Sequence, residues 1–387
     1  MYRKISFLLL MIILPVLLAS CNDDPSSVGL NLLQNGDLII IQPDSLPKPE
    51  VTPNVLDIVL EGGNPILLGK YKNTTAKMLV NFNIHISLDS INTVLQNNSR
   101  TVQSAWIEMT PKYKIGGESK ISFNLFRIKS KWSITSRFNY DSLAVLAGKT
   151  EQVTSTYDTQ LDSVYKVILN GQQVTGWLKD TSTDSLGLFF DPANTDNITG
   201  FQNIANSTSA TVMKLKVVLN NPVSSTDTLT FLPVNSIHVV NKFQNISTIP
   251  ANGIVLQGGT GLHARLKFQL PNLPAGTVIN SAVLEMKYDS TQTDKGSQFF
   301  STLDVRFLKD AEGKKPDSTA TYSISLNGDV YSGEIGPLVQ KWVSSKQQNN
   351  GLDLSIQNEE GTADKIFIRN DAQYWPKLKI IYTAKKP

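Results

Sequence analysis

Residue types that carry catalysis are scarce in this chain of 387 residues. It has three histidines, His85, His238 and His263, and none has a His, Asp or Glu partner at the spacing of a helical metal site such as HExxH. Residues 148–150 (GKT) end like a phosphate loop, but Leu143 stands where the leading glycine belongs. The sequence therefore predicts a protein without nucleophilic, metal-dependent or phosphate-transfer catalysis.

Paired carboxylates are the remaining route to chemistry, because the two acids of a glycosidase can meet only in the fold. Glu108 and Glu285 are the tempting pair, since they recur at the same place in two repeated segments. Equivalent places in two separate domains form one site only if the domains face each other. Solvated strand positions fit them better, so we expect a non-enzyme and keep a glycoside-active enzyme as the weaker alternative.

A cluster of oxygen-bearing side chains follows one of the expected strands. Asp191, Asn194 and Asp196 offer the hard ligands that Ca²⁺ prefers. Asx-rich turns have the same composition without any metal. We expect no cofactor, with a structural calcium ion at these residues as the alternative.

Aromatic side chains are the better lead, because sugar rings stack on them and sugar hydroxyls are then met by polar groups. Trp106, Trp132 and Trp375 have no aromatic counterpart in the internal repeat, so the fold does not demand them. Trp132 lies between Lys131 and Arg137 in an expected loop, and it is the favoured contact residue. These five residues form the candidate ligand-binding set.

Strand alternation distinguishes the tryptophans further. It places Ala105 and Ile107 on one face of a strand and Trp106 on the other. An outward Trp106 would serve either as a glycan platform or as a contact for the other domain. Trp177 and Trp342 occupy the same place in both copies, so we expect both in hydrophobic cores.

The elements that position these residues come from one module written twice. SAWIEM at 104–109 returns as SAVLEM at 281–286, and KLKVVL at 214–219 returns as KLKIIY at 377–382. Short runs of Val, Ile, Leu and Phe alternate with turn residues, which predicts an all-β protein of two tandem antiparallel, jelly-roll-like β-sandwiches. The expected boundaries are 54–221 for the first sandwich, 222–233 for a linker and 234–387 for the second sandwich, with a short helix leading into Trp342.

The amino terminus reads as an export signal for lipidation. Arg3 and Lys4 precede an apolar run that is too short to span a membrane, and residues 17–21 (LLASC) look like a lipobox with Cys21 as the lipidated residue. Residues 1–20 would be removed, and 21–53 would form a tether with a possible edge strand at 38–41. No other cysteine exists for a disulfide.

Charge and the acidic tract after Cys21 bear on partners and location. Loss of Arg3 and Lys4 reduces the 36 basic residues by two against 33 acidic ones, which leaves a net charge of +1. Such a balance argues against nucleic acid as a partner. Residues 22–24 (NDD) resemble the tract that sends some Gram-negative lipoproteins to the cell surface, so we expect a lipid anchor in the outer membrane, facing outward.

The second copy resembles a known family. Residues 264–288 (ARLKFQLPNLPAGTVINSAVLEMKY), with Trp342, GLDL and PKLKIIY, are similar to DNRLRE-type β-sandwich modules. The resemblance implies a carbohydrate-binding fold, alginate being one ligand of the family. Gln269 stands where the family has an acid, and no binding residue is carried over. The segment DDPSSVGLNLL after Cys21 resembles an uncharacterised family of surface lipoproteins from glycan-foraging bacteria.

A recurring Asp-Ser or Asp-Thr pair followed by a small or apolar residue resembles the O-glycosylation signal of the same bacteria. Asp-Ser is also a good turn pair, and both interpretations expect exposed loops. The candidate acceptors are Ser45, Ser90, Ser142, Ser163, Ser185, Thr228, Ser290 and Ser318.

Together these observations predict a non-catalytic, lipid-anchored envelope protein that binds polysaccharide through its sandwiches. The alternative is a structural or assembly lipoprotein that contacts other outer-membrane proteins. Its membrane partner would be reached through the N-terminal lipid alone.

Overall fold

A computed structural model describes most of the chain from residue 38 onward. The described residues are 38–58, 63–82, 93, 95–117, 120–128, 132, 140, 150–158, 164–180, 186–193, 196–202, 212–220, 226–274, 276–344 and 348–384. The expected signal segment, Cys21 and residues 22–37 of the expected tether lie outside these ranges. Within the described part, no helix has the length and apolar character needed to cross a bilayer.

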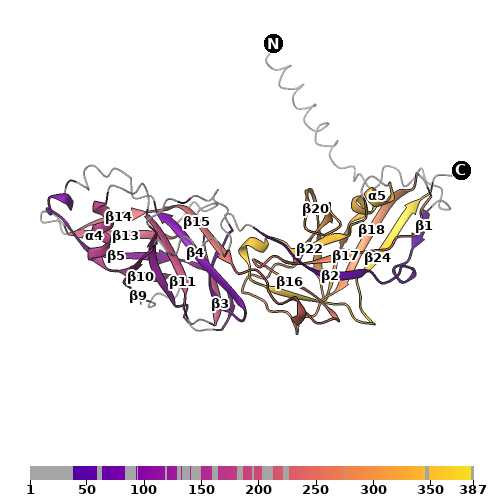
Figure 1. Ribbon diagram of the computed structural model, residues 1–387, viewed down its shortest axis with the longest axis horizontal. Helices are drawn as coiled ribbons and strands as arrows, with labels where there is room; N and C mark the ends of the chain where they lie inside the picture. Colours follow the sequence, from indigo (N-terminus) through magenta and orange to yellow (C-terminus); the bar gives the residue numbers. More distant parts are fainter. Residues whose placement is uncertain are drawn as a thin grey trace, which may run out of the picture.

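The described chain is all-β, as expected, and folds into two β-sandwiches that lie end to end (Figure 1). Their strands pair antiparallel throughout the named elements. Two short α-helices, α4 (Gly171–Lys179) and α5 (Gly336–Val343), complete them. The helix expected before Trp342 is thus confirmed as α5, and α4 is its unexpected equivalent in the first sandwich.

The first sandwich packs a five-stranded sheet against an eight-stranded one. The five-stranded sheet has the order β14 (Thr226–Phe231), β13 (Lys214–Asn220), β5 (Thr101–Met109), β10 (Tyr165–Leu169) and β9 (Ser155–Asp158). The other sheet has the order β6 (Pro111–Gly116), β12 (Asn197–Phe201), β3 (Ile66–Tyr71), β4 (Thr74–Phe82), β11 (Leu186–Pro192), β7 (Phe123–Ile128) and β8 (Thr150–Val153), with β15 (Pro233–Val240) on β4.

Apolar residues at every second strand position build the core between these sheets. Ala105, Ile107 and Met109 of β5 are at most 1% exposed and meet Met78 and Val80 of β4. Helix α4 closes one end of this core. The Asn170 side chain accepts hydrogen bonds from the first backbone N–H groups of the helix, which its N-terminus needs.

The second sandwich is one eleven-stranded sheet curled on itself. Its order is β1 (Leu38–Ile41), β24 (Lys377–Thr383), β18 (Val278–Lys287), β21 (Val330–Glu334), β20 (Pro316–Asn327), β19 (Thr302–Leu308), β22 (Leu352–Ile356), β17 (Leu262–Lys267), β16 (Gly253–Gln257) and β23 (Lys365–Arg369), with β2 (Glu50–Val55) on β17. The edge strand expected at 38–41 is confirmed as β1.

The expected domain boundaries are wrong at both ends of the first sandwich. Strands β1 and β2 come before the first sandwich in sequence, yet they pair with β24 and β17 of the second. Residues expected as a linker form β14, and β15 pairs with β4 of the first sandwich. The first sandwich is therefore inserted after β2, and the chain crosses the domain junction twice.

The internal repeat is reproduced in the pairing. Strand β5 pairs with β13, and β18 pairs with β24, in the same register: Lys214 lies opposite Glu108, and Lys377 lies opposite Glu285. Each pair also has an irregularity at the same place, directly before Ser104 in one copy and directly before Ser281 in the other. The copies thus share strand order, register and the local bend.

Candidate functional site

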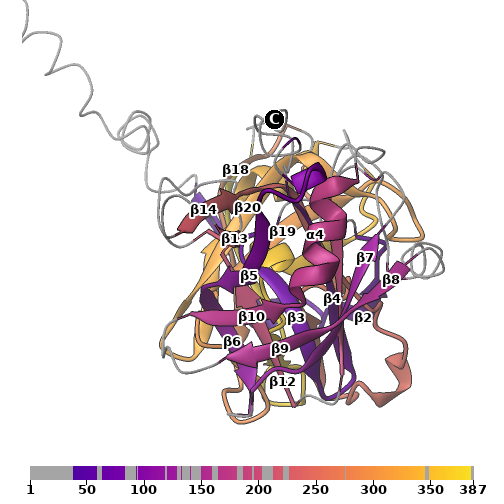
Figure 2. The same cartoon turned by 90° about the vertical axis from the view of Figure 1, so that its left-hand side faces the viewer.

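The outward face of the five-stranded sheet carries an unusual group of side chains. Because Ala105 and Ile107 point into the core, Trp106 points away from it, as the alternation predicts. Lys216 of β13 lies opposite Trp106 on one side, and Ile168 of β10 lies opposite it on the other. In Figure 2 this sheet is at the front, ahead of the strands of the second sandwich.

We call this surface the Trp106 face; it consists of Trp106, Glu108, Lys166, Ile168 and Lys216. Trp106 is partly exposed and Ile168 is 38% exposed. Junction contacts between the sandwiches come from other elements, such as Tyr113 of β6. The described contacts of Trp106 are with Glu108, Lys166 and the paired residues of its own sheet, and they do not support packing against the second domain.

Hydrogen bonds and charges fix the orientation of the indole ring. Nε1 of Trp106 donates to Oε1 of Glu108 at 2.8 Å, and Nζ of Lys216 lies 3.1 Å from the same oxygen. Nζ of Lys166 lies 4.4 Å from the centroid of the Trp106 ring. Partial burial alone would raise the pKa of Glu108, but the hydrogen bonds from Trp106 and Lys216 bring it below its usual value. Glu108 is therefore ionised and holds both partners.

The charge of the Trp106 face is positive. Lys166 and Lys216 belong to it, and Lys214 lies opposite Glu108 on the same side of β13. Glu108 lies among them, and Asp158 of β9 is paired with Lys166 in the strand register. A partly exposed ring beside ammonium groups can stack on a sugar ring and attract a carboxylate.

Trp132, the favoured contact residue, is buried. It is 8% exposed and packs with Leu79, Phe189 and Ile237 on the outward side of the eight-stranded sheet. A Cβ on Gly187 would lie 2.7 Å from its Nε1, so the ring lies directly over β11. The expectation of an exposed ligand contact is wrong here, because this sheet face needs an apolar cover. Lys131 and Arg137 lie outside the described residues.

Trp375 is partly exposed but belongs to the other end of the molecule. It precedes β24, and Nζ of Lys377 lies 5.3 Å from its ring centroid and 2.8 Å from Oδ1 of Asp44. Figure 1 shows β24 and β5 in opposite halves of the molecule. The structure therefore does not bring Trp375 and Trp106 into one site.

The remaining paired positions follow the sequence expectations for the core. Trp177 is 4% exposed and Trp342 is 8% exposed, each within the core of its own sandwich. Glu108 and Glu285 lie in different sheets, so they do not form a pair of catalytic acids.

The expected calcium ligands are partly engaged with other groups. Oδ1 of Asp191 lies 3.1 Å from Nζ of Lys77, and Oδ1 of Asp196 accepts from Asn197. Asn194 lies outside the described residues. Among those described, no three His, Cys, Asp or Glu side chains gather at metal-binding geometry.

The described Asp-Ser and Asp-Thr pairs have exposed acceptors, namely Ser45, Thr228, Ser290 and Ser318. Thr228 and Ser318 lie in strands rather than in loops, which corrects that expectation. Hydrogen bonds from the backbone and side chain of Thr319 bring the pKa of Asp317 to about 2, so local hydrogen bonding within the strand explains this Asp. Ser90, Ser142, Ser163 and Ser185 lie outside the described residues.

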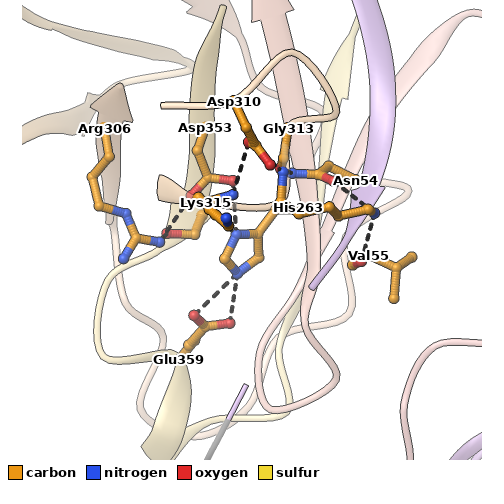
Figure 3. Close-up of polar contacts among 11 residues, drawn as sticks. Asn54, Val55, His263, Arg306, Asp310, Gly313, Lys315, Asp353 and Glu359 are labelled. Atoms are coloured by element: carbon orange, nitrogen blue, oxygen red, sulfur yellow. Dashed lines mark hydrogen bonds and ion pairs between the residues drawn. The ribbon is translucent and has the colours of Figure 1, made fainter. Parts of the chain in front are cut away.

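Sequence reasoning missed a buried ion cluster in the second sandwich (Figure 3). Nδ1 of His263 lies 2.9 Å from Oδ1 of Asp353, and its Nε2 lies 2.9 Å from Oε2 of Glu359. Arg306 approaches the other oxygen of Asp353 at 2.9 Å. Burial alone would lower the pKa of His263, but the two carboxylates raise it to about 10. His263 is therefore a buried cation that ties β17 to β22 and to the turn at Glu359.

The cluster borders a cavity of about 500 Å³. Asp304, Arg306, Glu359 and Glu360 line it, together with Asn64 from the crossing segment. Burial and the neighbouring Glu359 raise the pKa of Asp304. No single sequence motif predicts this arrangement, because its residues lie on separate strands and turns.

Polar contacts join the two sandwiches at a second hollow. Oη of Tyr113 donates to Oδ1 of Asp364 at 2.8 Å and accepts from the backbone N–H of Ala363 at 3.0 Å. Lys72 reaches both carboxylate oxygens of Asp294, at 2.6 and 2.7 Å. These contacts, with the two chain crossings, fix the junction.

Comparisons with known proteins add little. No protein-family model matches the chain, so its likeness to DNRLRE-type modules stays a prediction, and no curated protein matches it. Among solved structures, the C-terminal domain of the Streptococcus agalactiae AgI/II polypeptide BspA is similar with 12% identity, covers 87% of this chain and 92% of its own, and has a TM-score of 0.19. The C-terminal domain of the Streptococcus pyogenes antigen I/II-family protein AspA gives 9% identity, 88% and 92% coverage, and a TM-score of 0.19. At such TM-scores these likenesses carry no argument about this chain.

Proposed function

We propose that this protein is a non-catalytic, lipid-anchored protein of the outer membrane that binds an acidic polysaccharide on the Trp106 face. The observation that carries the proposal is a partly exposed tryptophan, flanked by lysines, at a strand position where the second copy has Val283. The fold does not need the ring there, as its own repeat demonstrates.

The geometry suits a stacked sugar with a nearby carboxylate. Glu108 accepts from Nε1 of Trp106, so the ring is oriented before a ligand arrives and less side-chain entropy is lost on binding. Lys166 lies over the ring in the free protein. Moving it aside costs about 0.5–1 kcal/mol at an exposed site. A uronate carboxylate beside the ring offsets this cost by pairing with the same ammonium group.

The position of the Trp106 face also fits an anchored protein. Strand β1 is the first described strand after Cys21, and Figure 1 places it in the half of the molecule opposite β5. A lipid on Cys21 would therefore hold the second sandwich nearer the membrane. The first sandwich would then present its five-stranded sheet outward.

Affinity electrophoresis of the full chain in mild detergent tests the proposal. Gels containing a polyuronate should retard the protein, and gels containing a neutral glucan should retard it less. The variant Trp106→Val, which installs the residue of the second copy, should be retarded clearly less by the polyuronate than the original protein. Retardation should fall with added salt, because exposed charges are screened.

The matched control is Lys379→Ala, which changes the second-copy equivalent of Lys216. It should bind like the original protein. The proposal is wrong if no polysaccharide retards the chain, or if Trp106→Val and Lys379→Ala behave alike.

The assembly alternative has one observation in its favour. Strand β1 is an edge strand with Ile39 42% and Ile40 49% exposed, and Val278 of β18, on the far side of β24, is 55% exposed. Edge strands accept added strands from partner chains. Crosslinking from Ile40 to an outer-membrane protein, with loss of the crosslink on Ile40→Lys, would favour this function over polysaccharide binding.

A further inference from the structure

A cleft of about 500 Å³ lies where the two sandwiches meet. One wall is the β3–β4 hairpin with its turn at Lys72, and a second wall is the crossing segment 241–250. The third wall comes from the second sandwich, through Gln257, Asp294 and Lys365. We call it the interdomain cleft.

The walls of this cleft are held in place by hydrogen bonds among themselves. The Asn241 side chain accepts from the backbone N–H of Thr75 at 2.5 Å and donates to the carbonyl of Asn73 at 2.9 Å. Nε2 of Gln257 donates to Oγ1 of Thr74 at 2.6 Å, across the junction. A ligand would therefore meet a preformed site, which reduces the entropy lost on binding.

Positive charge dominates the lining. Asp294 is the only described acid there, and Lys72 engages both of its oxygens. Burial by itself would lower the pKa of Lys72, but Asp294 raises it. Lys365 also lines the cleft, and no carboxylate among the described residues pairs with its ammonium group. An anionic ligand would supply the missing partner.

The rest of the lining selects among anions. The rings of Tyr71 and Phe243 border the cleft, and Phe243 is partly exposed. Gln244 and Asn245 contribute amide groups beside them. Rings next to amides and hydroxyls suit a sugar, whose faces are apolar and whose edges carry hydroxyls, better than a small inorganic anion.

We propose that the interdomain cleft is a second binding site, which takes a short acidic oligosaccharide. Its carboxylate pairs with Lys365, and one sugar ring lies against Phe243. The site shares no residue with the Trp106 face. A failure to bind at the cleft would therefore not contradict binding at the Trp106 face, and the reverse also holds, although both sites would bind uronates.

Calorimetric titration of the full chain in mild detergent tests this. The measurement uses a Trp106→Val background, so that the Trp106 face does not contribute to binding. The probe is a tetrasaccharide of uronic acids. We expect saturable binding at one site. Adding Lys365→Gln should weaken it about tenfold or more, because a charge-assisted hydrogen bond is lost. Phe243→Ala should weaken it by a similar factor.

Controls separate the site from general effects. Lys379→Gln, on an exposed strand position outside the cleft, should leave the affinity unchanged. Cellotetraose should bind less tightly, and acetate should compete poorly. Thermal unfolding verifies that Lys365→Gln and Phe243→Ala are folded. The proposal is overturned if the tetrasaccharide does not bind, if neither cleft variant changes its affinity, or if acetate displaces it fully.

Discussion

The two copies of the module share a strand pair but differ in what they place on its outer face. In the first copy Trp106 lies between Ile168 and Lys216, with Lys166 over the ring. In the second copy Val283 lies between Glu334 and Lys379. The core sides of both pairs are buried and apolar. Folding thus fixes one side of the strand, and the other side is available for binding.

The second copy uses its outer acid for structure. Glu334 takes the place of Ile168, and it accepts hydrogen bonds from the backbone N–H of Ala282 at 2.6 Å and of Gly336 at 2.8 Å. Glu334 therefore ties the start of α5 to the bend in β18. The same position in the first copy holds an exposed apolar side chain, so the helix start there is held by Asn170 instead. The comparison separates a structural copy from a candidate binding copy.

The largest effect should come from the buried ion cluster of the second copy. His263→Gln removes the cation between Asp353 and Glu359, and breaking a buried pair in this way costs about 3–5 kcal/mol. Chemical denaturation should show this loss, while retardation by polyuronate at low denaturant should persist. If His263→Gln abolished retardation in folded protein, the division of roles between the copies would be wrong.

The same cluster predicts a stability that falls in alkali. His263 has its pKa raised from 6.5 to about 10, so native protein keeps a proton that the unfolded chain releases between these values. The free energy of unfolding should therefore be highest below about pH 6.5 and fall by about 1.4 kcal/mol per pH unit toward pH 10. Denaturation curves at several pH values measure the slope, and His263→Gln should flatten it. An unchanged slope in that variant would contradict the assignment.

His238 should act in the opposite direction. Burial brings its pKa down to about 3, so the unfolded chain binds a proton below about pH 6.5 that the native protein does not. The stability that His238 contributes is thus present above pH 6.5 and lost as the pH falls. His238→Asn, compared with the original protein between pH 4 and 7, should show a weaker acid dependence.

Transplanting the binding residues offers a reciprocal test of the copies. Val283→Trp with Ser332→Lys gives the second sheet pair the equivalents of Trp106 and Lys166. In a Trp106→Val background this double variant should restore part of the polyuronate retardation, since an exposed ring and a cation are worth about 1 kcal/mol. Failure to restore any binding would show that Ile168 or the shape of the first face is also required.

The smallest expected effect is the difference in polyuronate binding between variants of two equivalent lysines, Lys216 and Lys379. Lys216→Ala removes a cation of the Trp106 face and one partner of Glu108, which should weaken polyuronate binding about threefold to fivefold. Lys379→Ala, its equivalent in the second copy, should change nothing measurable. Binding isotherms at low salt measure both. Equal losses would indicate a general effect of net charge rather than a site.

Much of the fold could be predicted from the sequence because it depends on local patterns. Alternation placed Trp106 outward and Ile107 inward, and the repeat predicted which strands are equivalent. Trp132 was misjudged because neighbouring Lys131 and Arg137 suggested a solvated loop. The apolar outer side of β11, which Trp132 covers, is visible only when the eight-stranded sheet is assembled.

The sequence by itself determined the all-β class, the repeat and the outward position of Trp106, since each follows from spacing along one strand. Tertiary structure decided the rest. Strands β1 and β2 join the second sandwich because hydrogen-bonding edges are open there, across the whole inserted domain. His263, Arg306, Asp353 and Glu359 meet because neighbouring strands bring them together, and the interdomain cleft exists because the chain crosses the junction twice. Contacts between residues so distant in sequence depend on packing, which no local pattern encodes.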